Sequence, residues 1–173
     1  MITNNGSKFI GYGKISTGGV VADLVDINGD TTATISGITN VYNQCSCRNT
    51  DSTASAGNMT GMIMVLGVGT TPATAADYCL AETELDGVDI NTFIKCLHPI
   101  GSETWSATQT ENGSFVYSFS FVNDSDKTVA VTEIGLYFLH TSGKYLCGRC
   151  VIPARVVMPG ENFTLSYNLN LAG

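Results

Sequence analysis

The stretch FVYSFSF at residues 115–121 places an aromatic side chain at every second position, with Val or Ser between them. A period of two is typical of a β-strand that buries one face and exposes the other. Residues 163–171, FTLSYNLNL, repeat the pattern with large apolar residues alternating with Thr, Ser and Asn. These two stretches predict half-buried strands and set the fold class as β.

Further strands are predicted by apolar runs between turn residues. Residues 62–66, MIMVL, form a continuous apolar run that Gly67 ends, which indicates a short strand covered on both faces. Residues 129–139 and 145–152 predict two more strands. Pro153 is expected to end the second, because proline cannot donate a hydrogen bond to a central ladder.

Two local turns are also predicted. Residues 20–27 and 31–35 flank Asn28 and Gly29, a dipeptide that favours a two-residue type I′ hairpin turn with positive φ at both positions. Residues 74–85 begin with a potential capping Thr and two Ala, which favours a short helical turn.

Together these segments give at least eight strands at spacings of about ten residues, which predicts an all-β fold. We expect one domain, an antiparallel β-sandwich of jelly-roll-like form over residues 20–173, preceded by an N-terminal arm over residues 1–19. The side chains expected in the core are Phe119, Val131, Ile134, Leu136, Leu165, Tyr167 and Leu169.

Composition excludes several classes of function. The 173 residues carry a net charge of −7 with only 8 Lys and Arg, so the basic surface that binds nucleic acid is missing, and an anionic membrane would repel the chain. No apolar run approaches the roughly 20 residues that span a bilayer, and the first 20 residues lack the layout of a signal peptide. We therefore expect a soluble protein made inside a cell, without nucleic-acid or membrane partners.

The six cysteines are expected to be free thiols, since a reducing cytoplasm disfavours disulfides. Cys45 and Cys47 together with Cys147 and Cys150 offer four thiolates to a structural zinc ion. However, residues three apart on a strand point to opposite faces, which argues against Cys147 and Cys150 sharing a metal. We predict no metal and no cofactor.

No catalytic residues are predicted. His98 and His140 stand at the ends of extended segments, without a local Ser, Cys or carboxylate motif of the kind that marks a nucleophilic site. Trp105 lies among small polar residues, where it can serve an interface or stack on a sugar ring. The densest acidic stretch is interpreted as a solvated face and comprises Asp77, Glu82, Glu84, Asp86 and Asp89.

Three segments resemble a pattern found in small bacteriophage structural proteins. Residues 65–80, VLGVGTTPATAADYCL, are similar to a strand that ends in a Gly-x-Gly-Thr-Thr-Pro turn followed by Asp-Tyr. Residues 119–137, FSFVNDSDKTVAVTEIGLY, resemble the family's strand, Asn-rich turn and Thr-Glu-Ile-Gly-Leu-Tyr strand. Residues 146–171, LCGRCVIPARVVMPGENFTLSYNLNL, resemble its arginine-bearing strand, Pro-Gly-Glu turn and terminal strand.

The resemblance implies a virion component, assembled in the host cytoplasm. It would be an auxiliary capsid (decoration) protein or a tail-associated subunit that binds other virion proteins and self-associates, without catalysis. The alternative is a carbohydrate-binding adhesin module of a tail fibre, with a glycan partner and a role for Trp105. An enzyme is the third and least favoured class.

The N-terminal arm is the predicted attachment segment. It carries Phe9, Ile10 and Tyr12 among Gly, Ser and Asn, too few apolar residues for a core of its own and more than an inert tail needs. These three residues and Trp105 are therefore predicted to form an interface with a neighbouring subunit. The other interpretation is that the arm is simply the first strand of the sandwich.

Overall fold

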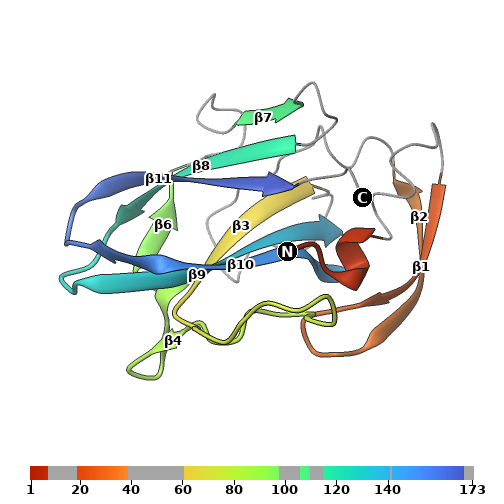
Figure 1. The fold of residues 1–173 in the computed structure, drawn as a ribbon, viewed down its shortest axis with the longest axis horizontal. Helices are drawn as coiled ribbons and strands as arrows, with labels where there is room; N and C mark the ends of the chain where they lie inside the picture. The colour runs from red at the N-terminus through yellow and green to blue at the C-terminus, as the bar shows by residue number, and fades with distance from the viewer. Residues whose placement is uncertain (8–18, 39–60, 98–105, 110–114, 141, 170–173) are drawn as a thin grey trace.

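The computed structural model describes residues 1–7, 19–38, 61–97, 106–109, 115–140 and 142–169 (Figure 1). Strands in antiparallel pairs dominate these residues, so the fold is all-β, as the alternating sequences predict. The elements in chain order are β1 (Gly19–Val25), β2 (Thr31–Ile38), β3 (Gly61–Gly67), β4 (Glu84–Leu85), β5 (Val88–Asp89), the 3₁₀ turn η1 (Ile90–Thr92), β6 (Ile94–Cys96), β7 (Ser106–Gln109), β8 (Phe115–Asn123), β9 (Val129–His140), β10 (Gly143–Val157) and β11 (Asn162–Leu169).

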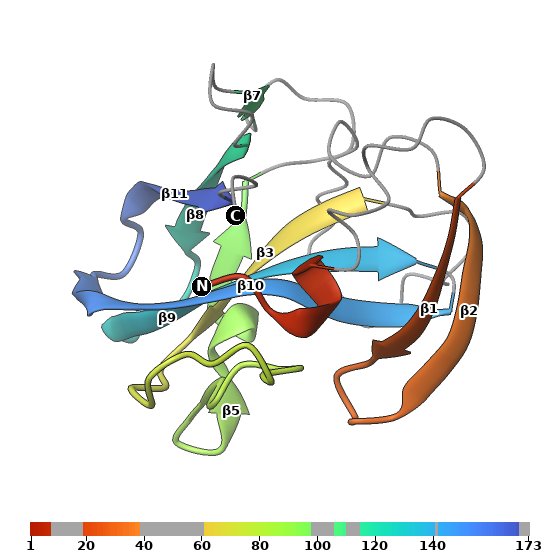
Figure 2. The same ribbon diagram turned by 45° about the vertical axis from the view of Figure 1, so that its right-hand side comes forward.

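Two antiparallel sheets provide most of the structure. In the β9 sheet the strand order is β10-β9-β3, and in the β8 sheet it is β11-β8-β6, with β7 also pairing with β8. The chain passes from the β8 sheet to the β9 sheet after β8 and returns after β10. The hairpins β1–β2 and β4–β5 form two smaller sheets, and the long β1–β2 hairpin stands beside the two main sheets (Figure 2).

Side chains from both main sheets share one buried cluster, as period-2 burial requires. Six of the seven predicted core residues are buried, whereas Leu165 is half-buried and packs against the cluster. The largest completely buried aromatic side chains are Tyr117, Phe119, Phe138 and Tyr145. The finer expectation of a jelly-roll-like sandwich stays a prediction.

The β9 sheet is covered on its second face as well. Ile63 and Val65 of β3, Tyr137 of β9 and Leu146 of β10 form a second buried cluster there. Leu80 joins this cluster from the connection between β3 and β4. The prediction that residues 62–66 are covered on both faces is thus confirmed, and the segment that covers them builds the candidate site.

The β1–β2 hairpin forms as predicted, but its turn type does not. Gly29 has positive φ (86°) and Asn28 does not, and the Gly29 amide donates to the Asp26 carbonyl at 3.0 Å. The Asp26 carboxylate also accepts bonds from the amides of Asn28 and Asp30, both at 2.9 Å. This side chain mimics a backbone turn, so a longer loop replaces the two-residue type I′ turn.

Two other local predictions are wrong. Pro153 does not end β10, because the pairing with β9 shifts between Val151 and Arg155, and the proline falls within this irregularity. Residues 74–85 do not form a helix. The Thr74 amide and hydroxyl instead bond the Asp77 carboxylate at 2.8 and 2.7 Å, which closes a single turn.

Residues 1–7 lie on β10 of the same chain (Figure 1). The Thr3 amide donates to the Cys147 carbonyl at 3.1 Å, and the Arg149 amide donates to the Met1 carbonyl at 3.0 Å. The Asn5 side chain then bonds both the amide and the carbonyl of Val25. The first part of the predicted arm therefore pairs with its own domain.

Candidate functional site

Residues 68–83, here called the capping loop, cross the second face of the β9 sheet, and side chains of this sheet bond several of their backbone groups. Arg149 of β10 is 2% exposed and reaches this loop with its guanidinium group. Its Nη2 donates to the Thr71 carbonyl at 2.8 Å and its Nη1 to the Pro72 carbonyl at 3.4 Å. Nη1 also pairs with the Asp77 carboxylate at 2.6 Å. The Thr-Thr-Pro turn is thus held by one buried arginine.

Glu133 of β9 completes this arrangement as the buried anion. It is fully buried and accepts a charge-assisted hydrogen bond from Arg149 Nε. Its other contacts are the amides of Ala81, at 2.9 Å, and Glu82, at 3.4 Å. The two flanking glycines make room for the carboxylate, because a Cβ atom at Gly67 or Gly69 would lie 2.6 or 2.5 Å from its Oε2. We call Arg149, Glu133 and Asp77 the ionic lock.

The lock keeps Arg149 and Asp77 ionised. Burial alone would raise the pKa of Asp77, but hydrogen bonds from Thr74 and Arg149 outweigh it, and the pKa lies below its ordinary value. Burial alone would likewise lower the pKa of Arg149, yet its bonds to Asp77 and Glu133 raise it. The interpretation of Asp77 as part of a solvated acidic face is therefore wrong, whereas Glu82, Glu84, Asp86 and Asp89 are exposed.

Two further side chains of β9 fix the capping loop. The Tyr137 hydroxyl accepts a bond from the Leu80 amide at 2.9 Å, and the Thr132 hydroxyl donates to the Gly69 carbonyl at 3.0 Å. Polar side chains of the sheet thus provide hydrogen bonds that a neighbouring strand would otherwise provide to the loop backbone. A connection without regular structure needs such partners, because buried backbone groups must be hydrogen-bonded.

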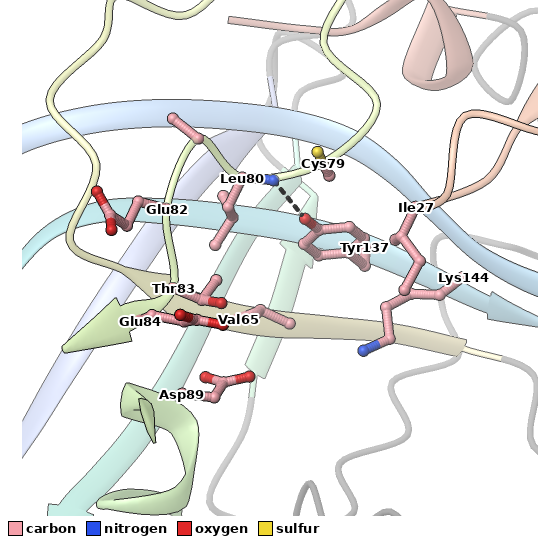
Figure 3. Close-up of a pocket in the computed structure, with 11 residues that line it drawn as sticks. Ile27, Val65, Cys79, Leu80, Glu82, Thr83, Glu84, Asp89, Tyr137 and Lys144 are labelled. Carbon is pink, nitrogen blue, oxygen red and sulfur yellow. Dashed lines mark hydrogen bonds between the residues drawn. The ribbon is translucent and has the colours of Figure 1, made fainter. Parts of the chain in front are cut away.

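A groove of about 570 Å³ opens beside the capping loop (Figure 3). Val65, Leu80 and Tyr137 contribute to its apolar part, and Ile27, from the tip of the β1–β2 hairpin, lines it as well. Lys144, at the start of β10, lies at the end of the groove beside Ile27 (Figure 3). The groove therefore combines an apolar sheet surface with charged side chains.

Lys144 is the half-buried cation of this groove. Its ammonium lies 5.9 Å from the centre of the Tyr137 ring, within the range of a cation–π interaction. Burial lowers the pKa of Lys144, and the negative charge of Asp89 opposes this only in part. No salt bridge joins Lys144 to any residue that the structure describes. The carboxylates of Glu82, Glu84 and Asp89 also line the groove, away from Ile27 (Figure 3).

Two reactive side chains of the groove have raised pKa values. Cys79 is its nucleophilic side chain, but burial and the charges of Asp77 and Glu133 raise the pKa of this thiol. Since the thiolate is the reactive form, a raised pKa makes Cys79 a poor nucleophile near neutral pH. Burial also raises the pKa of Tyr137 far above its ordinary value, which keeps this phenol neutral. The arrangement suits an amphipathic group that brings an anion to Lys144.

The residues predicted from sequence to form an interface cannot be placed. Phe9, Ile10, Tyr12 and Trp105 lie outside the described residues, so their interface role stays a prediction. Leu97, the last described residue before Trp105, is 38% exposed.

The expectation that Cys147 and Cys150 point to opposite faces of the strand is wrong. Pairing between β9 and β10 shifts at Cys147, and this bulge puts Cys147 and Cys150 on the same face, where both contribute to the raised pKa of the Tyr167 phenol after burial itself. Cys45 and Cys47 lie outside the described residues. Within the described ranges, no cluster of three or more His, Cys, Asp or Glu residues is placed to hold a metal ion.

The sequence did not indicate the ionic lock or Lys144 as parts of a site. One signal was available for the lock, because Asp77, Glu133 and Arg149 each fall within a different segment of the phage-like pattern. Comparison with protein-family models, curated proteins and solved structures finds no match to this chain. No helix in the described part of the chain has the length and hydropathy to cross a bilayer.

Proposed function

We propose that this chain is a structural protein of a bacteriophage particle, an auxiliary capsid protein or a tail-associated subunit that binds neighbouring virion proteins without catalysis. The observation that carries the proposal is the meeting of the three resembling segments at Arg149. Asp77 and Arg149, which are 72 positions apart in the sequence, belong to one network of hydrogen bonds. The phage-like pattern therefore describes one structural unit, which supports the resemblance as a whole.

The electrostatics of the groove support a binding role. The Cys79 thiol and the Tyr137 phenol both have raised pKa values, so neither is activated for nucleophilic chemistry. Lys144 in contrast is a partly desolvated cation, and such a group gains most from an anionic partner. Ile27, which is 39% exposed, adds apolar surface to the groove.

Within this proposal, the groove receives a segment of a neighbouring virion protein that carries a carboxylate. The carboxylate would pair with Lys144, and the apolar part of the segment would cover Val65 and Ile27. A salt bridge formed in a half-buried groove is shielded from solvent more than one on the open surface. Attachment should therefore depend on Lys144 more than on an exposed lysine.

The test is incorporation into particles. Protein quantification of purified virions should find the chain at a fixed copy number per particle, and loss of the chain during purification would contradict the proposal. Particles assembled without it should bind purified wild-type chain, and Lys144→Met should weaken that binding at least about tenfold. Lys127→Met is the matched control, because Lys127 is exposed and pairs with Asp86 at 3.5 Å on the surface.

A further inference from the structure

Strand β11 is an edge of the β8 sheet in the described part of the chain, and its sequence contains none of the residues that discourage edge pairing. It pairs with β8 on one side through eight residue pairs without a register shift, and no described strand pairs with its other side. Its sequence NFTLSYNL contains no charged residue, proline or glycine. Proteins commonly protect edges with charges, prolines, bulges or covering segments, so an edge of this length and composition is unusual.

The edges of the β9 sheet, by comparison, carry such protection. At β10, the Thr3 amide bonds the Cys147 carbonyl, and the strand continues through Pro153 and the charged Arg155. At β3, the Asn91 side chain bonds both the amide and the carbonyl of Leu66, at 3.0 and 2.9 Å. Among the edges formed by described strands of these two sheets, β11 thus differs from β10 and β3 in having no such contact from the described residues.

The outward-facing side chains of β8 and β11 are short and uncharged. The Ser118 and Ser166 hydroxyls bond each other across the strands at 2.7 Å, and those of Ser120 and Thr164 do so at 2.9 Å. Lys95 of β6 lies opposite Val122 at one end of this array. The eight outward positions of the two strands are Val116, Ser118, Ser120, Val122, Asn162, Thr164, Ser166 and Asn168.

We propose that two copies of this chain pair their β11 strands edge to edge, antiparallel about a two-fold axis, to form one continuous sheet of β8-β11-β11-β8. A two-fold axis pairs a strand with itself in antiparallel orientation, so every free amide and carbonyl at the centre of the edge finds a partner. The net charge of −7 opposes contact between two copies over most surfaces. The uncharged β11 strand is where that repulsion is small, so two copies can meet there.

The experiment measures self-association of the purified chain by sedimentation over a range of concentrations. Wild type should reach a monomer–dimer equilibrium, and the double variant Thr164→Lys with Ser166→Lys should raise the dissociation constant at least about tenfold, because four lysines then meet at the joined edges. The matched control is Ser118→Lys with Ser120→Lys. These residues lie directly opposite on β8, on the same face but away from the edge.

The control separates edge pairing from stacking of the two faces. If both double variants lose the dimer, the faces stack and edge pairing is wrong; a wild type that stays monomeric at every concentration also overturns it. Hydrogen exchange of the unmodified protein gives a second test, since alternate amides of β11 should gain protection as concentration rises. This proposal does not depend on the phage assignment, because association of the pure chain is measured without particles.

Discussion

Replacing Arg149 by Met removes the centre of the ionic lock and should destabilise the domain severely. Methionine keeps most of the aliphatic volume, so the variant reports the lost charge and hydrogen bonds more than a new cavity. Glu133 then remains fully buried with only the amides of Ala81 and Glu82 as donors. The carbonyls of Thr71 and Pro72 lose their guanidinium partner as well.

The expected loss follows from the burial of the pair. Removing one partner of a buried ion pair costs roughly 3–5 kcal/mol, because the remaining charge stays desolvated. Each kcal/mol lowers the melting temperature of a domain of this size by about 2–4 °C, so the variant should melt about 6–20 °C lower. Domains are stable by only about 5–15 kcal/mol, so much of the stability is removed.

The measurement is urea and thermal denaturation followed by circular dichroism, with Arg155→Met as the matched control. Arg155 lies on the same strand and pairs with Glu161 at 2.6 Å, but its side chain is 48% exposed. Such surface pairs contribute about 0–1 kcal/mol. If Arg149→Met loses no more stability than Arg155→Met, the ionic lock does not hold the capping loop.

Two further predictions concern the same loop. The lowered pKa of Asp77 means that its contribution to stability is complete above the unfolded value of 3.8 and is lost as pH falls through the lower folded value. Acid titration of the unfolding free energy should therefore show a loss below about pH 4 that Asp77→Asn reduces, and an unchanged slope would count against the pairing with Arg149. Tyr137→Phe leaves the buried Leu80 amide without its acceptor and should cost about 1–3 kcal/mol in urea denaturation, whereas the exposed Tyr78→Phe control should change stability by less than about 0.5 kcal/mol. Equal losses in the two tyrosine variants would contradict the role of the Tyr137 hydroxyl.

The strands could be predicted from sequence because their signal is local. In β8 and β11 each buried residue is two positions from the next, so a short stretch of sequence is enough to recognise the buried face. The type of the turn at Asn28 and Gly29 could not be predicted from these two residues, because the Asp26 carboxylate replaces the backbone bonds of the expected turn. Pro153 does not end its strand, because a shift in the pairing of β9 and β10 accommodates it.

The candidate site could not be predicted because its signal is tertiary. Arg149 is 16 positions from Glu133 and 72 from Asp77, and nothing in the spacing shows that they meet. Cys147 shows a second limit, since one bulged residue reverses the face of every later side chain on the strand. Period-2 reasoning is reliable only up to the first bulge.

The ionic lock also determines where function should be sought. Arg149, Glu133 and Asp77 satisfy the backbone of the capping loop and one another, so their roles are accounted for by folding. These three residues therefore account for how the resembling segments fold together, and the choice of partner should be sought among residues outside the ionic lock. We propose Lys144 as such a residue, because it lines the groove and falls between two of the resembling segments.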